Sequence, residues 1–174
     1  MSRLFGPITQ NGYVVEDVEA AARFWAETLG VGPFFMLPSI RFERYSYRGQ
    51  TTEPELRIAL ANSGGLQIEL IEQVNDAPSA YKDFLDVNGP GLQHLSVWSE
   101  SYATDTARYA DRGLEPLAEG LLPGGIGFTY YNTGLHAGAI MEVLDLRPEV
   151  KARMAAIREA AKAWDGSDPL RWPA

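Results

Sequence analysis

The sequence contains no cysteine, and this absence excludes several kinds of chemistry at once. A chain without thiols has no disulfide bonds, no thiolate zinc site and no cysteine nucleophile. It also has no apolar run near the roughly 20 residues that a membrane-spanning helix needs. The opening segment, residues 1–7, is too short and too interrupted to be a secretory signal peptide. We therefore expect a soluble, cytoplasmic protein.

Basic residues are scarce as well. The chain has 15 lysines and arginines against 23 aspartates and glutamates, which gives a formal net charge of −8. The sequence pI is about 4.8. Such an acidic chain is a poor partner for nucleic acid or an anionic membrane surface. At 174 residues and 45% hydrophobic, it can form one compact domain, or two small modules that share a core.

What the sequence does contain is a small unit that occurs twice. Each copy begins with a short apolar strand that leads into an acidic, alanine-rich helical stretch ending at a glycine. The two opening strands carry Gln10 and His94 at matching positions, and the two closing strands carry Glu69 and Glu142 at matching positions. All four side chains can bind a metal ion. A repeat that superposes potential ligands is more informative than any one of them alone.

The hydrophobic pattern predicts a βαβββ order in each copy. In the first copy we expect a strand at 8–15, a helix from the N-cap Asp17 to Gly30, and strands near 41–47, 55–61 and 66–72. A connector with a helical turn around 81–85 follows. In the second copy we expect a strand at 92–99, a helix at 102–111, and strands near 117, 126–131 and 139–146. The resulting division is a first module at 5–75, a connector at 76–91, a second module at 92–146, a C-terminal helix at 147–163 and a surface tail at 164–174.

Strand alternation predicts where the polar side chains point. Successive residues of a strand face opposite sides. If Ile68 and Leu70 face a helix-covered core, Glu69 faces the other side, and the same reasoning places His94 and Glu142 on that second face. This face also carries large apolar residues, namely Ile71, Trp98, Ile140 and Leu144. The pattern therefore predicts a concave apolar cleft, in which carboxylates cost free energy unless they are paired or bound to a metal.

The repeat and its motifs resemble the vicinal oxygen chelate superfamily. This superfamily includes glyoxalases, methylmalonyl-CoA epimerases, extradiol dioxygenases, and the fosfomycin and bleomycin resistance proteins. The resemblance covers about residues 5–146 and is carried by the segments 10–17, 24–25, 29–30, 68–72, 91–95 and 141–144. It implies an α+β fold in which two βαβββ modules form a glyoxalase/bleomycin resistance/dioxygenase-type half-open barrel. The C-terminal helix is an addition to that fold.

The resemblance also implies a metal site and a reaction. The ligands would be Gln10, Glu69, His94 and Glu142, the set found in eukaryotic glyoxalase I enzymes. One imidazole and three oxygen donors suit a divalent zinc, nickel, cobalt or manganese ion. By resemblance Glu142 is both ligand and catalytic base, and Glu69 is its counterpart on the opposite face of the substrate. The implied activity is that of a lyase or an isomerase/epimerase, with proton transfer α to a carbonyl or acyl thioester through a metal-stabilised enolate.

Departures from the family patterns narrow this activity. Val14 and Pro90 stand where glutathione-dependent glyoxalases carry arginines, which disfavours a glutathione hemithioacetal as substrate. Arg57, or else Glu55, stands where epimerases carry a second catalytic glutamate, so two-base epimerisation stays open. Gln10 breaks the 2-His-1-carboxylate iron site of the extradiol dioxygenases.

Simpler interpretations compete with the metal site. A single glutamate on a strand is usually solvated, and a single strand histidine usually packs or forms a hydrogen bond. The alternative function is a metal-free small-molecule binding protein of the bleomycin-resistance type, although a complete ligand set favours an enzyme. His136, between glycines, is interpreted as structural or solvent-exposed. We expect a small-molecule substrate with an apolar portion, and a homodimer by analogy with the family.

Overall fold

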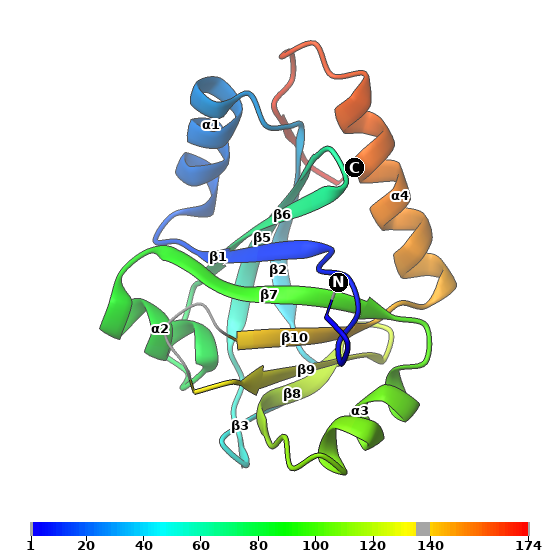
Figure 1. Cartoon of the computed structure of the whole chain (residues 1–174). Coiled ribbons are helices and arrows are strands. Elements are labelled where there is room, and N and C mark those ends of the chain that lie inside the picture. The colour runs from blue at the N-terminus through cyan, green and yellow to red at the C-terminus, as the bar shows by residue number, and fades with distance from the viewer. Residues whose placement is uncertain (1, 135–139, 174) are drawn as a thin grey trace.

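The computed structural model describes residues 2–134 and 140–173 (Figure 1). The first half contains β1 (Gln10–Val14), α1 (Val18–Leu29), β2 (Phe34–Arg41), β3 (Arg44–Tyr47), β4 (Gln50–Thr51), β5 (Glu55–Ser63) and β6 (Leu66–Gln73). The second half contains α2 (Ala80–Asn88), β7 (Gly91–Ser99), α3 (Tyr102–Ala110), β8 (Pro116–Leu122), β9 (Ile126–Asn132) and β10 (Ile140–Asp145). The chain then continues through α4 (Pro148–Lys162) and β11 (Leu170–Arg171).

All the named strands belong to one continuous sheet. Its order is β11-β2-β5-β6-β1-β7-β10-β9-β8-β3-β4. The order β1-β6-β5-β2 in one half is the same as β7-β10-β9-β8 in the other, and the antiparallel β1–β7 pair joins the two halves. The predicted fold class, α+β with two βαβββ arrangements, is therefore confirmed.

Helix α1 forms where the sequence provides both of its ends. The Asp17 side chain accepts a hydrogen bond from the Ala20 backbone N–H at 2.9 Å, which satisfies one of the free amides of the first turn. Gly30 ends the helix in the left-handed conformation, with φ of 67°. Buried Val18 and Ala22 then pack α1 against the sheet of the first half.

Both faces of the central strands are buried, as alternation predicts. Ile68 and Leu70 lie in the core beneath α1, whereas Ile71 lies in the cluster on the opposite face. In the second half, Val97 and Val143 pack with residues of α3. Figure 1 shows α1 and α3 outside the two halves of the sheet.

The predicted strand at 41–47 is present as β3, Arg44–Tyr47, but its expected place in the first half of the sheet is wrong. The second strand of the first copy is β2, which begins at the buried Phe34. Strand β3 leaves that half and pairs antiparallel with β8 of the other half. Gly120 of β8 permits this pairing, because a Cβ there would lie 2.2 Å from the Arg44 backbone oxygen. Buried Tyr45 and Tyr47 then anchor β3 in the central core.

The prediction of a surface tail is wrong for the segment around Leu170. This side chain is 7% exposed, and β11 pairs in parallel with β2. An apolar residue and an edge strand with free backbone groups together account for the added pairing. Earlier in the same segment, the Trp164 ring packs over Gly32.

Helix α4 follows the predicted span and packs against β5. Its buried residues are Val150 and Ile157. Within residues 2–134 and 140–173, no helix combines the length and apolar character that crossing a membrane requires.

Candidate metal centre

Glu69, Gly12 and His94 form one row across β6, β1 and β7. Gly12 pairs with Glu69 on one side and with His94 on the other. The His94 ring lies directly over Gly12, since a Cβ at residue 12 would be 1.9 Å from imidazole Cε1. Only glycine leaves room for the ring in this position. The result is a fully buried imidazole at the seam between the two halves.

Gln10, Ser96 and Glu142 form the neighbouring row. Ser96 of β7 pairs with Gln10 of β1 and with Glu142 of β10. Because residues two apart on a strand share a face, this row faces the same side as Glu69 and His94. Gln10 is 2% exposed and Glu142 is 6% exposed. The fold thus places all four predicted ligands on one face of the sheet.

Three of these side chains converge closely. His94 Nε2 lies 3.4 Å from Glu69 Oε2 and 3.6 Å from Glu142 Oε2. One ligand atom from each residue lies within 4.8 Å of the others. Metal–ligand bonds of about 2.0–2.2 Å separate neighbouring ligand atoms by about 3–3.5 Å. The three groups therefore have a spacing that one divalent ion can fill.

The orientation of His94 also suits a metal ligand. Its Nδ1 lies 2.7 Å from Gln93 Oε1, while Gln93 Nε2 donates to the Ala80 carbonyl at 3.0 Å. The second contact turns the Gln93 amide oxygen toward the ring, so we assign the imidazole proton to Nδ1. His94 Nε2 is then a free acceptor, and it has no hydrogen-bond partner. A ligating histidine is commonly held by a carbonyl on its other nitrogen in this way.

Sequence reasoning did not find the role of Gln93. Simple alternation places it on the face opposite to His94. The β1–β7 pairing shifts here, however, so that Gly12 pairs with His94 but Tyr13 pairs with Leu92, and Gln93 is skipped. Such a bulge redirects side chains, and local sequence carries no clear signal for it.

Gln10 presents a second orphaned acceptor. Its Nε2 donates to Gln67 Oε1 at 2.9 Å, and its own Oε1 is buried without a hydrogen-bond partner. Buried acceptors without partners are rare, and each calls for an explanation such as an ion. The amide oxygen is the atom by which a glutamine binds a metal. Alternation places Gln67 on the same face as Glu69, but it does not indicate this contact with Gln10.

The charges of the site favour a bound cation. Burial raises the pKa of Glu142, attraction to His94 opposes this shift, and repulsion by Glu69 adds to it. Burial alone lowers the pKa of His94, but the carboxylates of Glu69 and Glu142 outweigh it and raise that pKa. Two carboxylates that converge in a poorly hydrated site cost free energy unless a positive charge lies between them. A divalent cation offsets that cost, so the residues present fit a metal ion.

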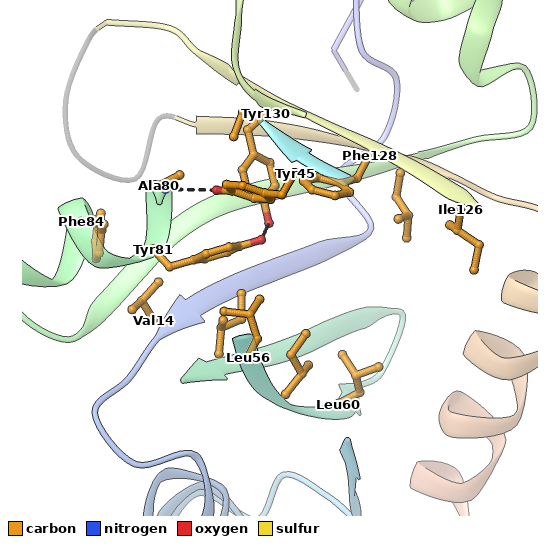
Figure 2. Packing of buried hydrophobic residues seen from close by; sticks show 14 of the residues in the cluster. Val14, Tyr45, Leu56, Leu60, Ala80, Tyr81, Phe84, Ile126, Phe128 and Tyr130 are labelled. Carbon is orange, nitrogen blue, oxygen red and sulfur yellow. Dashed lines mark hydrogen bonds between the residues drawn. The ribbon is translucent and has the colours of Figure 1, made fainter. Parts of the chain in front are cut away.

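The site opens into a cavity of about 380 Å³ between the two halves. Gln10, Glu69 and Glu142 line it, together with an apolar wall. Figure 2 shows residues of this wall facing each other from the two halves of the sheet: Leu56 and Leu60 on one side, and Ile126, Phe128 and Tyr130 on the other. Helix α4 contributes Val150, Arg153 and Met154 to the lining.

Two tyrosines add polar groups to the cavity wall. The Tyr81 and Tyr130 hydroxyls lie 2.9 Å apart, and both residues line the cavity (Figure 2). Burial raises the pKa of both phenols, so both stay protonated. Their mutual hydrogen bond uses only one of the two protons. Tyr130 also interacts with Glu142, because a hydrogen bond from its hydroxyl lowers the pKa of that carboxyl.

The alternative base on the third strand of the first copy is not supported. Glu55 accepts hydrogen bonds from Ser39 and Arg41. Arg57 lies 3.6 Å from Glu72 in an ion pair. Neither Glu55 nor Arg57 lines the cavity. His136 lies outside the described residues.

Comparisons with known proteins agree with this fold. A family model described as the Glyoxalase/Bleomycin resistance protein/Dioxygenase superfamily matches residues 9–131. A hypothetical protein from Bacillus halodurans superposes with a TM-score of 0.60 at 16% identity, over 81% of this chain and 94% of that one. The methylmalonyl-CoA epimerase from Mycobacterium tuberculosis gives 0.58 at 19% identity, over 87% and 95%.

A third structure is a variant of the Streptomyces coelicolor methylmalonyl-CoA epimerase in complex with 2-nitronate-propionyl-CoA. It gives a TM-score of 0.55 at 20% identity, over 82% of this chain and 95% of that one. No curated protein matches the sequence. At these identities the structural likenesses concern the fold, whereas the family model covers most of the chain. The chain belongs to the Glyoxalase/Bleomycin resistance protein/Dioxygenase superfamily, also known as the vicinal oxygen chelate superfamily.

Proposed function

We propose that the chain is a divalent-metal-dependent enzyme that moves a proton at a carbon next to a carbonyl or acyl thioester. The activity is that of an isomerase/epimerase or a lyase. The observation that supports it most is the convergence of Glu69, His94 and Glu142 on one point beside the cavity, with ligand atoms within 4.8 Å of one another. The orphaned oxygen of Gln10 adds a fourth donor.

Each residue of the site has a distinct role in the proposed proton transfer. Gln10, Glu69, His94 and Glu142 would hold a divalent ion, which would supply positive charge beside the substrate oxygen on which negative charge develops. Glu142 takes the proton from the α-carbon and later loses it to solvent, and Glu69, protonated beforehand by solvent, gives a proton to the opposite face. Both carboxylates line the cavity, whose apolar walls hold the apolar part of the substrate and exclude water.

The metal content of the purified protein tests the site. One imidazole nitrogen and three oxygens suit zinc, nickel, cobalt or manganese. We expect about one of these ions per chain by mass spectrometry, and none in Glu142→Ala. Native protein that stays free of metal after incubation with each of the four ions would contradict the proposal.

Hydrogen exchange with solvent tests the chemistry. We would incubate the metal-loaded protein in deuterium oxide with a panel of 2-oxo acids and acyl-CoA thioesters. We expect deuterium at the α-carbon of at least one compound, and none with Glu142→Gln. The epimerase neighbours justify the acyl-CoA arm of the panel. No exchange in any compound would remove the support for proton transfer.

The second candidate is a metal-free protein that binds and sequesters a small molecule. The cavity, with its aromatic and aliphatic wall, favours this function independently of the metal ligands. The two functions give opposite results in the metal analysis. A chain without metal that still binds apolar compounds in this cavity would support the second candidate.

A further inference from the structure

Helix α4 reaches the proposed metal site through two hydrogen bonds. Gln67 Nε2 donates to Met154 Sδ at 3.2 Å, and Gln67 Oε1 accepts from Gln10 Nε2 at 2.9 Å. Gln67 is completely buried on β6, beside Gln10 on the parallel strand β1. The path therefore runs from the C-terminal helix, through one buried amide, to a proposed ligand.

The direction of each amide follows from this path. A thioether sulfur accepts hydrogen bonds but does not donate them, so Met154 requires the NH₂ group of Gln67 to face it. The oxygen of Gln67 then faces Gln10 and requires the NH₂ group of Gln10. Reversing Gln67 would set two acceptors against each other at Met154 and two NH₂ groups against each other at Gln10. The chemistry of one sulfur thus determines which atom of Gln10 is left without a partner.

We propose that Gln67 and Met154 are positioning residues that hold Gln10 with its Oε1 toward the metal ion. This inference rests on the proposed function, because it concerns the same metal site. The amide nitrogen of glutamine is a poor ligand, since its lone pair is delocalised into the carbonyl. A reversed Gln10 would present N–H groups to a cation. Correct orientation is therefore a condition for this residue to act as a ligand at all.

The inference gives the C-terminal helix a role in the metal site. The family model ends at residue 131, before α4 begins at Pro148. The helix therefore lies beyond the residues that the family model matches. On this view α4 both lines the cavity and orients a ligand on its floor.

The affinity for Co²⁺ tests the inference without any substrate. We would measure it for the full-length protein by isothermal titration calorimetry. Gln67→Met keeps the length of the side chain but removes the acceptor for Gln10, and we expect it to weaken Co²⁺ binding about 10- to 100-fold. Met154→Leu keeps the volume but removes the acceptor for Gln67, and we expect a weaker loss in the same direction. Gln73→Met, on the same strand but outside the site, should leave the affinity unchanged.

A double-mutant cycle separates orientation from general damage. In a Gln10→Glu background the ligand is a symmetric carboxylate that needs no orientation. Adding Gln67→Met there should change Co²⁺ affinity by no more than about twofold. An equal loss in both backgrounds, or no loss in either, would overturn the positioning role while leaving the metal site intact. Native protein that binds no Co²⁺ would overturn both the inference and the proposed function.

Discussion

Gly12 shows how a single hydrogen atom in place of a side chain makes room for a candidate ligand. The His94 ring occupies the volume into which a Cβ at residue 12 would project, 1.9 Å from Cε1. Gly12 also pairs with both Glu69 and His94, so any shift of the backbone at this point moves two proposed ligands together.

Replacing Gly12 by alanine therefore has a predictable effect. We expect Gly12→Ala to lower the free energy of unfolding by about 1–3 kcal/mol, as overpacking of a filled core does. Because the imidazole must move, zinc affinity should fall as well. Urea denaturation and zinc titration measure the two effects. Gly65→Ala is the matched control, since nothing lies within 4 Å of a Cβ there. Equal behaviour of the two variants would contradict the prediction.

The convergence of the proposed ligands is predictable from sequence for a simple reason. Alternation along a strand has a period of two, so one assumption about the core orients every other side chain. This places Glu69, His94 and Glu142 on one face, and the repeat suggests that they meet. The roles of Gln93 and Gln67 cannot be predicted in this way. The role of Gln93 depends on a bulge, and the role of Gln67 depends on a methionine in the last helix.

At the scale of elements, the pairing of β3 with β8 is the main feature that sequence patterns miss. Local pattern identifies an apolar strand but does not identify its partner, and residues 41–47 look like a continuation of the first sheet. The prediction of a surface tail fails for the same reason, because the pairing of β11 with β2 places Leu170 in the core beneath α1.

The β3–β8 pair depends on Gly120. A Cβ there would lie 2.2 Å from the Arg44 backbone oxygen, and a backbone atom cannot rotate away as a side chain can. We expect Gly120→Ala to separate the two strands locally and to speed amide hydrogen exchange in β3. Gly91→Ala, which meets nothing within 4 Å, should leave that exchange unchanged. Unaltered protection of β3 in Gly120→Ala would show that the pair tolerates a side chain.

Helix α4 adds a charge to an otherwise acidic and apolar cavity. Among the described residues that line it, Arg153 is the only cation, and it has no ion-pair partner there. We expect the chelator-treated protein to prefer octanoate to 1-octanol. Arg153→Gln should weaken octanoate binding about two- to fivefold, as for an exposed ion pair worth up to about 1 kcal/mol.

Two controls isolate this charge. Binding of 1-octanol should be unaffected by Arg153→Gln, because the alcohol carries no anion. Arg158→Gln, on the same helix but outside the lining, should leave octanoate binding unchanged. Equal losses for the acid and the alcohol would show that Arg153 acts by packing instead.

At the scale of the molecule, the proposed metal site connects the two halves. Gln10 and Glu69 come from one half, and His94 and Glu142 come from the other. A ligand present at 1,000 times its Kd stabilises the folded state by about 4 kcal/mol. For a chain of this size that corresponds to a rise in Tm of about 8–16 °C. Calorimetry with zinc and with a chelator should show this difference, and Glu142→Gln should abolish it. An identical Tm in both conditions would argue against a shared ion.

The oligomeric state is a separate prediction. We expect a homodimer, on the basis of the family. Light scattering during size-exclusion chromatography should then give twice the chain mass of 19.2 kDa. A single-chain mass at micromolar concentration would contradict this. Phe24 and Leu29 on α1 are more than half exposed, and Phe24→Ser tests whether that helix contributes to the contact.

The β1–β7 seam also bears on how the chain acquires its structure. During synthesis β1 emerges early, but its antiparallel neighbour β7 follows only after the rest of the first half, and β3 likewise precedes its partner β8 by a large part of the chain. Loops of this length must close before their contacts form, which slows folding in proteins dominated by distant pairings. We therefore expect the first half of the chain to expose unpaired strand edges on the ribosome until the second half emerges.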